Sequence, residues 1–362
     1  MVGRDAADRE KGAVSKMQNE GLVRIDGSSG EGGGQILRTS VSLAALTGRP
    51  LEIHAIRGRR PRPGLQAQHL TAVRAAAALC GARLEGDAVG SQTLRFEPVH
   101  GVQAGEYHFD IGTAGATGLV AQTLLPALVH AGASTAHVTG GTHVPHAPTA
   151  EYVSEVYLPT LAAAGVRATW RMDQPGFFPR GRGAAELHIA AEGRVQPLVL
   201  EERGKLTTLR ALILTSRLPE HVAERGAAAV RQCLKEIGRT AEVEIRRQDA
   251  MDPGAAVVLV AECEGGRAGF TGLGERGKPM EKVAAAPCEE FLAWWKSGAA
   301  VDEHLADQLV PLLALAPGES RWTAPTATPH LSTVLEVAGR FLPITHSITP
   351  LPSGAVRIIL SS

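Results

Sequence analysis

The chain has 362 residues, 44% hydrophobic but only 4% aromatic, so a sizeable core must consist mostly of Ala, Val and Leu. This length suits two domains, or one large domain with an insertion. The 37 basic and 37 acidic residues cancel to a formal net charge of zero. That balance excludes a globally basic nucleic-acid-binding surface and leaves only local patches for such contacts.

Cysteine usage and hydropathy indicate a cytoplasmic protein. The four cysteines are widely spaced and form no CxxC pair, which is typical of reduced thiols. No apolar run approaches the roughly 18 residues that span a bilayer, so we expect no membrane contact. The first 22 residues are polar and charged, without an apolar signal core. We therefore expect residues 1–22 to form a flexible tail.

Along the chain a helical pattern, a glycine and a β-rich run recur. Apolar spacing of three and four begins at Leu37, Val41 and Ala44 and predicts helices. Further helices are expected at 68–80, 122–130, 152–164, 305–316 and 331–342. Strands are expected at 82–84, 92–96, 135–139, 166–172, 320–322, 345–348 and 355–360. The pattern predicts an α/β (α+β) fold of repeated βα units whose helices cover the sheets.

Residues 198–270 interrupt this rhythm. The segment is richer in charge, its expected helix at 222–237 is longer, and glycine-rich turns flank it. Its expected strands are at 198–200, 241–245 and 256–261. We predict a small α/β domain over 198–270, inserted into a large domain formed by residues 23–197 and 271–362.

A glycine-rich stretch, IDGSSGEGGGQILR, spans Ile25–Arg38 and leads into the first predicted helix. Glycine lets bare backbone approach a ligand, and the first N–H groups of a helix attract anions. The stretch lacks the Gly-Lys-Ser/Thr of a Walker A loop and fits the dinucleotide GxGxxG spacing poorly. It is either an anion-binding loop or a tight turn.

Four arginines fall within six residues at 57–62, in the loop RGRRPRPG. Their planar forks suit phosphate oxygens, and the two interleaved prolines stiffen the loop. A solvated surface turn is the alternative. Gln68 and His69 open the next helix, where they could bind a phosphate or cap the turn.

Histidines in three other places are candidates for chemistry. His143 and His146 lie three apart in TGGTHVPHAP, without a third ligand at suitable spacing, so a pocket-lining loop is favoured over zinc. His137 falls in a predicted strand. His304, Asp307 and Gln308 share one helix face, either as converging polar groups or as a solvent-facing stripe.

His330 follows the extended, proline-containing segment TAPTATP and starts a helix. The helix dipole disfavours the charged imidazole, and only a neutral imidazole has a lone pair for nucleophilic attack. The same helix end would stabilise an attached phosphate. A simple capping role is the alternative.

Five segments together resemble the RNA 3′-terminal phosphate cyclases. The segments are GSSGEGGGQILR, IRGRRPRPGLQAQHL, GGTHVPHAP, HLADQLVPLLAL and PHLSTVLEVAGRFLP. They occur in order between Val23 and Ile359. The resemblance implies repeated α/β units with a small inserted thioredoxin-like domain.

The resemblance also implies an ATP-dependent ligase-type reaction on RNA with a 3′-phosphate end, assisted by Mg²⁺ or Mn²⁺. A histidine attacks the α-phosphorus of ATP, becomes adenylylated and releases pyrophosphate. AMP then passes to the RNA 3′-phosphate, giving RNA(3′)pp(5′)A. The adjacent 2′-hydroxyl finally attacks the activated phosphorus, which forms the 2′,3′-cyclic phosphate and expels AMP.

Carried onto this sequence, the resemblance assigns a role to each matching residue. His330 is the nucleophile, and Glu31 is a carboxylate near the phosphates and the metal. The residues implied for ATP binding are Gln122, His304, Leu305, Ala306, Asp307 and Gln308. Those implied for phosphate or RNA binding are Arg38, Arg57, Arg60, Gln68 and His69.

The sequence departs from some family members at three positions. Some members have Tyr at the position of His304, Asp or Asn at that of His143, and Cys at that of Pro329. These differences bear on details of the pocket and not on the reaction. Two alternatives stay open. One is a non-catalytic relative that acts as a scaffold in ribosomal RNA maturation, against which the presence of His330 and Glu31 argues. The other is an enolpyruvyl transferase, which rests on fold analogy alone.

Overall fold

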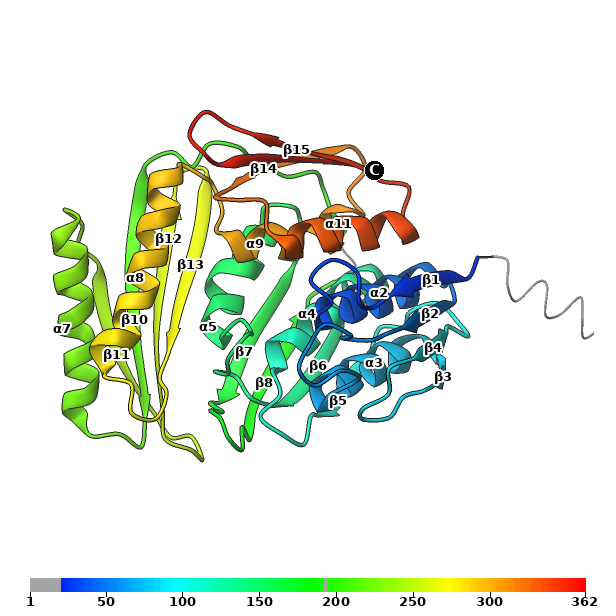
Figure 1. Ribbon diagram of the computed structural model, residues 1–362, viewed down its shortest axis with the longest axis horizontal. Coiled ribbons are helices and arrows are strands. Elements are labelled where there is room, and N and C mark those ends of the chain that lie inside the picture. The colour runs from blue at the N-terminus through cyan, green and yellow to red at the C-terminus, as the bar shows by residue number, and fades with distance from the viewer. Residues whose placement is uncertain (1–20, 192–193) are drawn as a thin grey trace, which may run out of the picture.

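The computed structural model describes residues 21–191 and 194–362. Of the expected tail at 1–22, residues 1–20 therefore lie outside the described part. Within that part the strands form four mixed sheets of four strands each (Figure 1). No helix in the described ranges is both long and apolar enough to cross a membrane.

Three successive units share the element order βαβαββ. The first consists of β1 (Val23–Asp26), α2 (Gly34–Thr47), β2 (Leu51–His54), α3 (Ala67–Cys80), β3 (Arg83–Glu85) and β4 (Leu94–Glu97). The second consists of β5 (Glu106–Asp110), α4 (Thr117–Ala131), β6 (Ser134–Gly140), the helical run α5 (Ala150–Tyr152), η1 (Val153–Tyr157) and α6 (Leu158–Ala162), β7 (Ala168–Gln174) and β8 (Gly183–Ile189). The third consists of β9 (Val199–Leu200), α9 (Glu303–Gln308), α10 (Val310–Leu313), β14 (Glu319–Ala324), α11 (Pro329–Phe341), β15 (Thr345–Pro350) and β16 (Val356–Ser361).

The three units also share one strand topology. Their sheets have the orders β1-β2-β4-β3, β5-β6-β8-β7 and β9-β14-β16-β15. In each, the first two strands are parallel and the last two join antiparallel. The predicted α/β class with repeated units is confirmed.

A fourth unit of different topology is inserted between β9 and α9. Its elements are β10 (Leu206–Ser216), α7 (Glu220–Glu236), β11 (Glu242–Gln248), β12 (Gly254–Cys263), β13 (Gly266–Leu273) and α8 (Met280–Ser297). The sheet order is β11-β10-β12-β13. One sheet face packs with α7 and α8 in a separate apolar core. The other face joins the main core.

The packing places the ends of this unit differently from the predicted boundaries, 198 and 270. The expected strand at 198–200 is β9, which pairs in parallel with β14 of the third repeat. At the other end, Phe291 and Trp294 of α8 are fully buried against the inserted sheet. The compact unit therefore runs from Leu206 to Ser297.

The helices of the repeats pack on one another, and this packing builds the site. The first-repeat helix α2 contacts α3, α4 and α11, and Figure 1 shows α11 lying along α2. Buried apolar residues cover most of α2, and Gly48, with φ +68°, ends it in the left-handed conformation. Because α2 is wedged between other helices, its first turn stays fixed beside the first turn of α11.

Candidate active site

His330 is the second residue of α11 and projects from the helix start. The side chain of Thr328, the N-cap, accepts a hydrogen bond from the Leu331 N–H at 3.1 Å. Pro329 occupies the first helical position, where its missing N–H carries no penalty. The imidazole is 46% exposed, so a ligand can reach it.

Both ring nitrogens of His330 face a partner on the glycine-rich segment. Nε2 lies 2.6 Å from Oε2 of Glu31, and Nδ1 contacts Oε1 of Gln35, in the first turn of α2. Burial lowers the pKa of His330, and Arg38, Arg60 and His304 lower it further, whereas Glu31 acts against them. The environment therefore favours a neutral imidazole near pH 7.

A relay from Asp307 determines which ring nitrogen carries the proton. The side-chain amide of Gln35 donates to Oδ2 of Asp307 on α9. Because an ionised carboxylate only accepts, the Gln35 NH₂ points to Asp307 and its oxygen points to His330. Nδ1 of His330 then donates to Gln35, which leaves the lone pair of the neutral ring on Nε2.

Asp307, at the far end of this relay from His330, is buried. Burial raises its pKa to about 7, although Gln35, His304 and Arg38 stabilise the ionised form. Gln35 was not among the predicted residues. A polar side chain in the first helical turn after the glycine-rich loop was the available signal.

The arginine loop lies across the glycine-rich loop. Arg60 Nη2 donates to Glu31 Oε1 at 2.5 Å, and Arg59 Nη1 donates to the Gly30 carbonyl at 2.8 Å. Gly30, with φ +52°, packs against α11, where any Cβ would collide with Oγ1 of Thr333. Glycine here lets the loop carry Glu31 to His330.

Donors surround the N-terminus of α2. Gly33 caps the helix without a side-chain hydrogen bond. Nε2 of His69 lies so close to Gly34 that a Cβ there would collide with it, and the same Cβ would be 3.2 Å from Arg38 Nη1. His69 Nδ1 accepts from the Gln66 N–H at 3.3 Å, which leaves Nε2 as the donor. The positive end of the α2 dipole, the Nε2–H of His69 and the guanidinium of Arg38 therefore lie together, an arrangement typical of anion-binding sites.

The ionisation states of these donors follow from burial. Burial, together with the charges of Arg38 and Arg57, lowers the pKa of His69 to about 3. Burial also lowers the pKa of Arg38 to about 10, against the favourable charges of Asp307 and Glu31. At neutral pH His69 is therefore uncharged and Arg38 is a cation.

Arg57 and Gln68 take part in structural hydrogen bonds. Arg57 Nη1 donates to the carbonyls of Arg62 at 2.6 Å and Gly64 at 3.0 Å, which shapes the arginine loop from within. Gln68 Oε1 accepts from the Ala116 N–H at 3.0 Å, at the N-cap of α4. Their contact with a phosphate stays a prediction.

In the segment 304–308 some side chains lie in the core and others reach the surface. The side chains of Leu305 and Ala306 are buried in the main core, so only their backbone groups could contact a nucleotide, and their role in ATP binding stays a prediction. Gln308 accepts a 2.8 Å hydrogen bond from Gln122 of α4, and both are partly exposed. His304 is exposed beside them.

His143 does not line a pocket as predicted. Its ring is fully buried, with Nε2 2.7 Å from Glu151 Oε2 and Nδ1 2.8 Å from Thr142 Oγ1, and it stacks on Phe177. The pair ties the loop after β6 to α5. A buried, paired histidine of this kind is structural.

Glu31 is the residue that would hold a magnesium or manganese ion here, and its Oε1 and Oε2 now face Arg60 and His330. In the described ranges Glu31 belongs to no group of three potential ligands. Mg²⁺ commonly uses one or two carboxylates together with substrate phosphates. Glu31, beside the donors at the α2 N-terminus, suits that arrangement.

Fold and site together define a protein of repeated βαβαββ units, with a histidine held between the first turns of α2 and α11. The family model for RNA 3′-terminal phosphate cyclase matches residues 29–348. The chain belongs to this family.

Curated relatives carry the same family name. Proteins named RNA 3′-terminal phosphate cyclase from Methylococcus capsulatus and Pyrobaculum neutrophilum are 48% and 46% identical, covering 88% and 89% of this chain and 91% and 93% of their own lengths. A solved structure, the enolpyruvyl transferase NikO from Streptomyces tendae, matches with a TM-score of 0.27 and 14% identity over 47% of this chain and 33% of that chain. Similarity this low bears on neither fold nor function.

Proposed function

We propose that this protein is an ATP-dependent RNA 3′-phosphate cyclase that works through a covalent His330–AMP. The observation that carries the proposal is the setting of His330, between the carboxylate of Glu31 and the amide of Gln35, at a helix start. Family membership supports the reaction class, and this geometry supports His330 as the nucleophile.

In the first step Nε2 of His330 attacks the α-phosphorus of ATP. A nitrogen–phosphorus bond forms, and the bond to the pyrophosphate oxygen breaks. Oε2 of Glu31 lies 2.6 Å from Nε2, where the carboxylate can accept a proton that reaches Nε2 and so keep the lone pair free for attack. Gln35 keeps Nδ1 protonated throughout.

The retained Nδ1 proton also serves the second step. An RNA 3′-phosphate oxygen attacks the AMP phosphorus, and the nitrogen–phosphorus bond breaks. Because Nδ1 holds its proton, His330 leaves as neutral imidazole rather than as a poor imidazolate leaving group. RNA(3′)pp(5′)A is the product.

In the third step the ribose 2′-hydroxyl attacks the RNA 3′-phosphorus, and AMP leaves with the bridging oxygen. The hydroxyl proton passes to solvent. The nucleophile is already adjacent, so the step requires orientation above all. A DNA end lacks this hydroxyl and stops at the previous intermediate.

The main electrostatic obstacle is the approach of two phosphates. Arg38, Arg60, the His69 Nε2–H and the α2 N-terminus would offset that charge. A bound Mg²⁺ or Mn²⁺, held by Glu31 and the phosphates, would supply further neutralisation. Gln122, His304 and Gln308 would bind the nucleoside part of ATP.

Labelling with α-³²P ATP tests the proposal. We expect acid-labile label on the wild-type protein and none on His330→Ala. His346→Ala, at an exposed position in β15, is the matched control and should label normally. Label retained by His330→Ala would overturn the nucleophile assignment. An unlabelled wild-type protein that still binds RNA would indicate a non-catalytic scaffold.

A further inference from the structure

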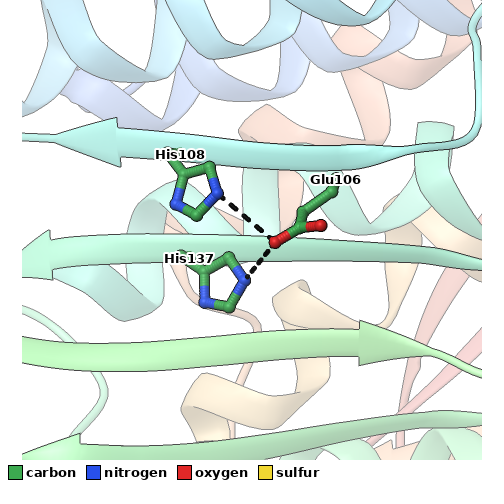
Figure 2. A group of neighbouring side chains, drawn as sticks. All are labelled: Glu106, His108 and His137. Atoms are coloured by element: carbon green, nitrogen blue, oxygen red, sulfur yellow. Dashed lines mark ion pairs between the residues drawn. The ribbon is translucent and has the colours of Figure 1, made fainter.

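The second sheet carries a group of histidines outside the active site. Glu106 and His108 lie two residues apart on β5 and therefore share a face. His137 of β6 is directly paired with His108 in the parallel register. All three side chains reach the solvent-facing side of the sheet, where they lie together (Figure 2).

Their spacing matches the ligand shell of a metal ion. Oε1 of Glu106 is 3.4 Å from Nε2 of His108 and 3.3 Å from Nε2 of His137. Two ligand atoms on a tetrahedral Zn²⁺, each about 2.0–2.1 Å from the metal, are separated by about 3.3 Å. The three potential ligand atoms all lie within 4.8 Å of one another.

A further carboxylate lies beside the second ring nitrogen of His137. Nδ1 of His137 is 3.5 Å from Oε2 of Glu186, on the neighbouring strand β8. Arg171 of β7 in turn contacts Glu186 at 3.3 Å. Metal-bound histidines commonly have a carboxylate on this side of the ring. Nε2 of His137 is then the nitrogen left for a metal.

Simple ion pairing explains the arrangement less well. The rings of His108 and His137 are stacked, with centroids 4.5 Å apart and planes 8° apart. Both rings direct Nε2 at the same Glu106 oxygen (Figure 2), a convergence that a single ion pair does not require. Exposed ion pairs also contribute little stability.

We propose that Glu106, His108 and His137 form a surface site for a transition-metal dication, with Zn²⁺ as the reference ion. Because a metal lies in the plane of each imidazole, the exposed His108 ring would turn out of its parallel stack with His137 on binding, and water would complete the tetrahedron. The site shares no residue with the active site.

A metal ion bound here would link the edge strand of the second sheet to its neighbour. β5 is an edge strand in the order β5-β6-β8-β7, and the metal would bridge it to β6. The loop after β5 ends at Ala116, whose N–H is held by Gln68. Metal binding would therefore raise the thermal stability of the folded protein, by an amount that grows with the logarithm of the free metal concentration once it exceeds the Kd.

Calorimetric titration of the tag-free protein with Zn²⁺ tests the proposal. We expect one equivalent to bind, and His108→Gln, His137→Gln and Glu106→Gln each to weaken binding by about tenfold or more. His188→Gln is the control. It changes a histidine on the same sheet face, whose Nδ1 is 3.2 Å from Thr135 Oγ1, and should leave the affinity unchanged.

Co²⁺ provides a second readout. The wild-type protein should develop the visible absorption of a tetrahedral nitrogen–oxygen site, and His137→Gln should not. Retained Zn²⁺ affinity in His137→Gln, no saturable binding by the wild type, or a thiolate-to-cobalt charge-transfer band would each overturn the proposal. Circular dichroism of the metal-free variants, expected to match the wild type, ensures that lost binding is not lost folding.

Discussion

Replacing Asp307 by Asn should slow self-adenylylation, although the Asn side chain still fills the same space. Asn can present either its oxygen or its NH₂ to Gln35, so the direction of the relay is no longer fixed. When Gln35 turns its NH₂ toward His330, Nδ1 becomes the acceptor and Nε2 holds the proton. That tautomer has no lone pair at the attacking nitrogen.

The size of the effect follows from the hydrogen bond that is changed. A hydrogen bond to a charged partner contributes about 1.5–3 kcal/mol. Since about 1.4 kcal/mol is a factor of ten, we expect a loss of about 10- to 100-fold in the single-turnover rate. Glu303→Gln, an exposed neighbour on α9, is the matched control and should retain the wild-type rate.

The pH profile separates this role from a merely structural one. Burial raises the pKa of Asp307 to about 7, whereas the pKa of His330 is lowered. The wild-type rate should therefore rise with pH through about 7 as Asp307 ionises, and Asp307→Asn should lack this rise. A variant with wild-type rate and an unchanged profile would refute the relay.

Stability should move in the opposite direction. The pKa of Asp307 is about 7 in the folded protein, above its ordinary value of 3.8. Between these two pKa values the folded state binds more protons than the unfolded state, so the free energy of unfolding falls as pH rises. Asp307→Asn removes this loss. Urea unfolding at pH 5 and pH 8 should show a smaller decrease for the variant than for the wild type.

Three other substitutions test separate parts of the site. Glu31→Gln removes the proton acceptor beside His330, and single-turnover labelling should fall by about 10²-fold or more; a rate within twofold of wild type would contradict its role. Gly34→Ala places a Cβ against His69 Nε2, so the KM for ATP should rise about tenfold or more in initial-rate assays, and an unchanged KM would count against an anion site at α2. Tyr152→Phe removes the 2.9 Å hydrogen bond to buried Asp302, the N-cap of α9, and should lower the free energy of unfolding by about 1–3 kcal/mol in urea titrations; no loss would mean that the carboxylate is satisfied without it.

Local sequence patterns predicted the elements whose periodicity is strong. The helix expected at 68–80 is α3 at Ala67–Cys80, ended by Gly81 in the left-handed conformation. Other elements left weaker signals. The helix α8 contains Pro287, which argues locally against a helix, yet its apolar face is buried against the inserted sheet.

Long-range pairing explains the remaining differences. The strand β9 has only two residues and pairs with Arg321 and Trp322, more than 100 positions away, so no local pattern could assign it to the third repeat. Sequence also singled out His330 but not Gln35. The role of Gln35 arises only when α2, α9 and α11 meet.

The same reasoning applies to the histidine group on β5 and β6. His108 and His137 are 29 positions apart, and only the strand register pairs them. Period-two alternation can place Glu106 beside His108, but it cannot choose the neighbouring strand. Spacing within one segment therefore predicts metal ligands better than spacing across a sheet.

Mass spectrometry after incubation with ATP and Mg²⁺ tests the central claim most directly. The account predicts one added AMP, located by fragmentation on the peptide that contains His330 and lost on mild acid treatment. An unmodified protein, or AMP on any other residue, would contradict it.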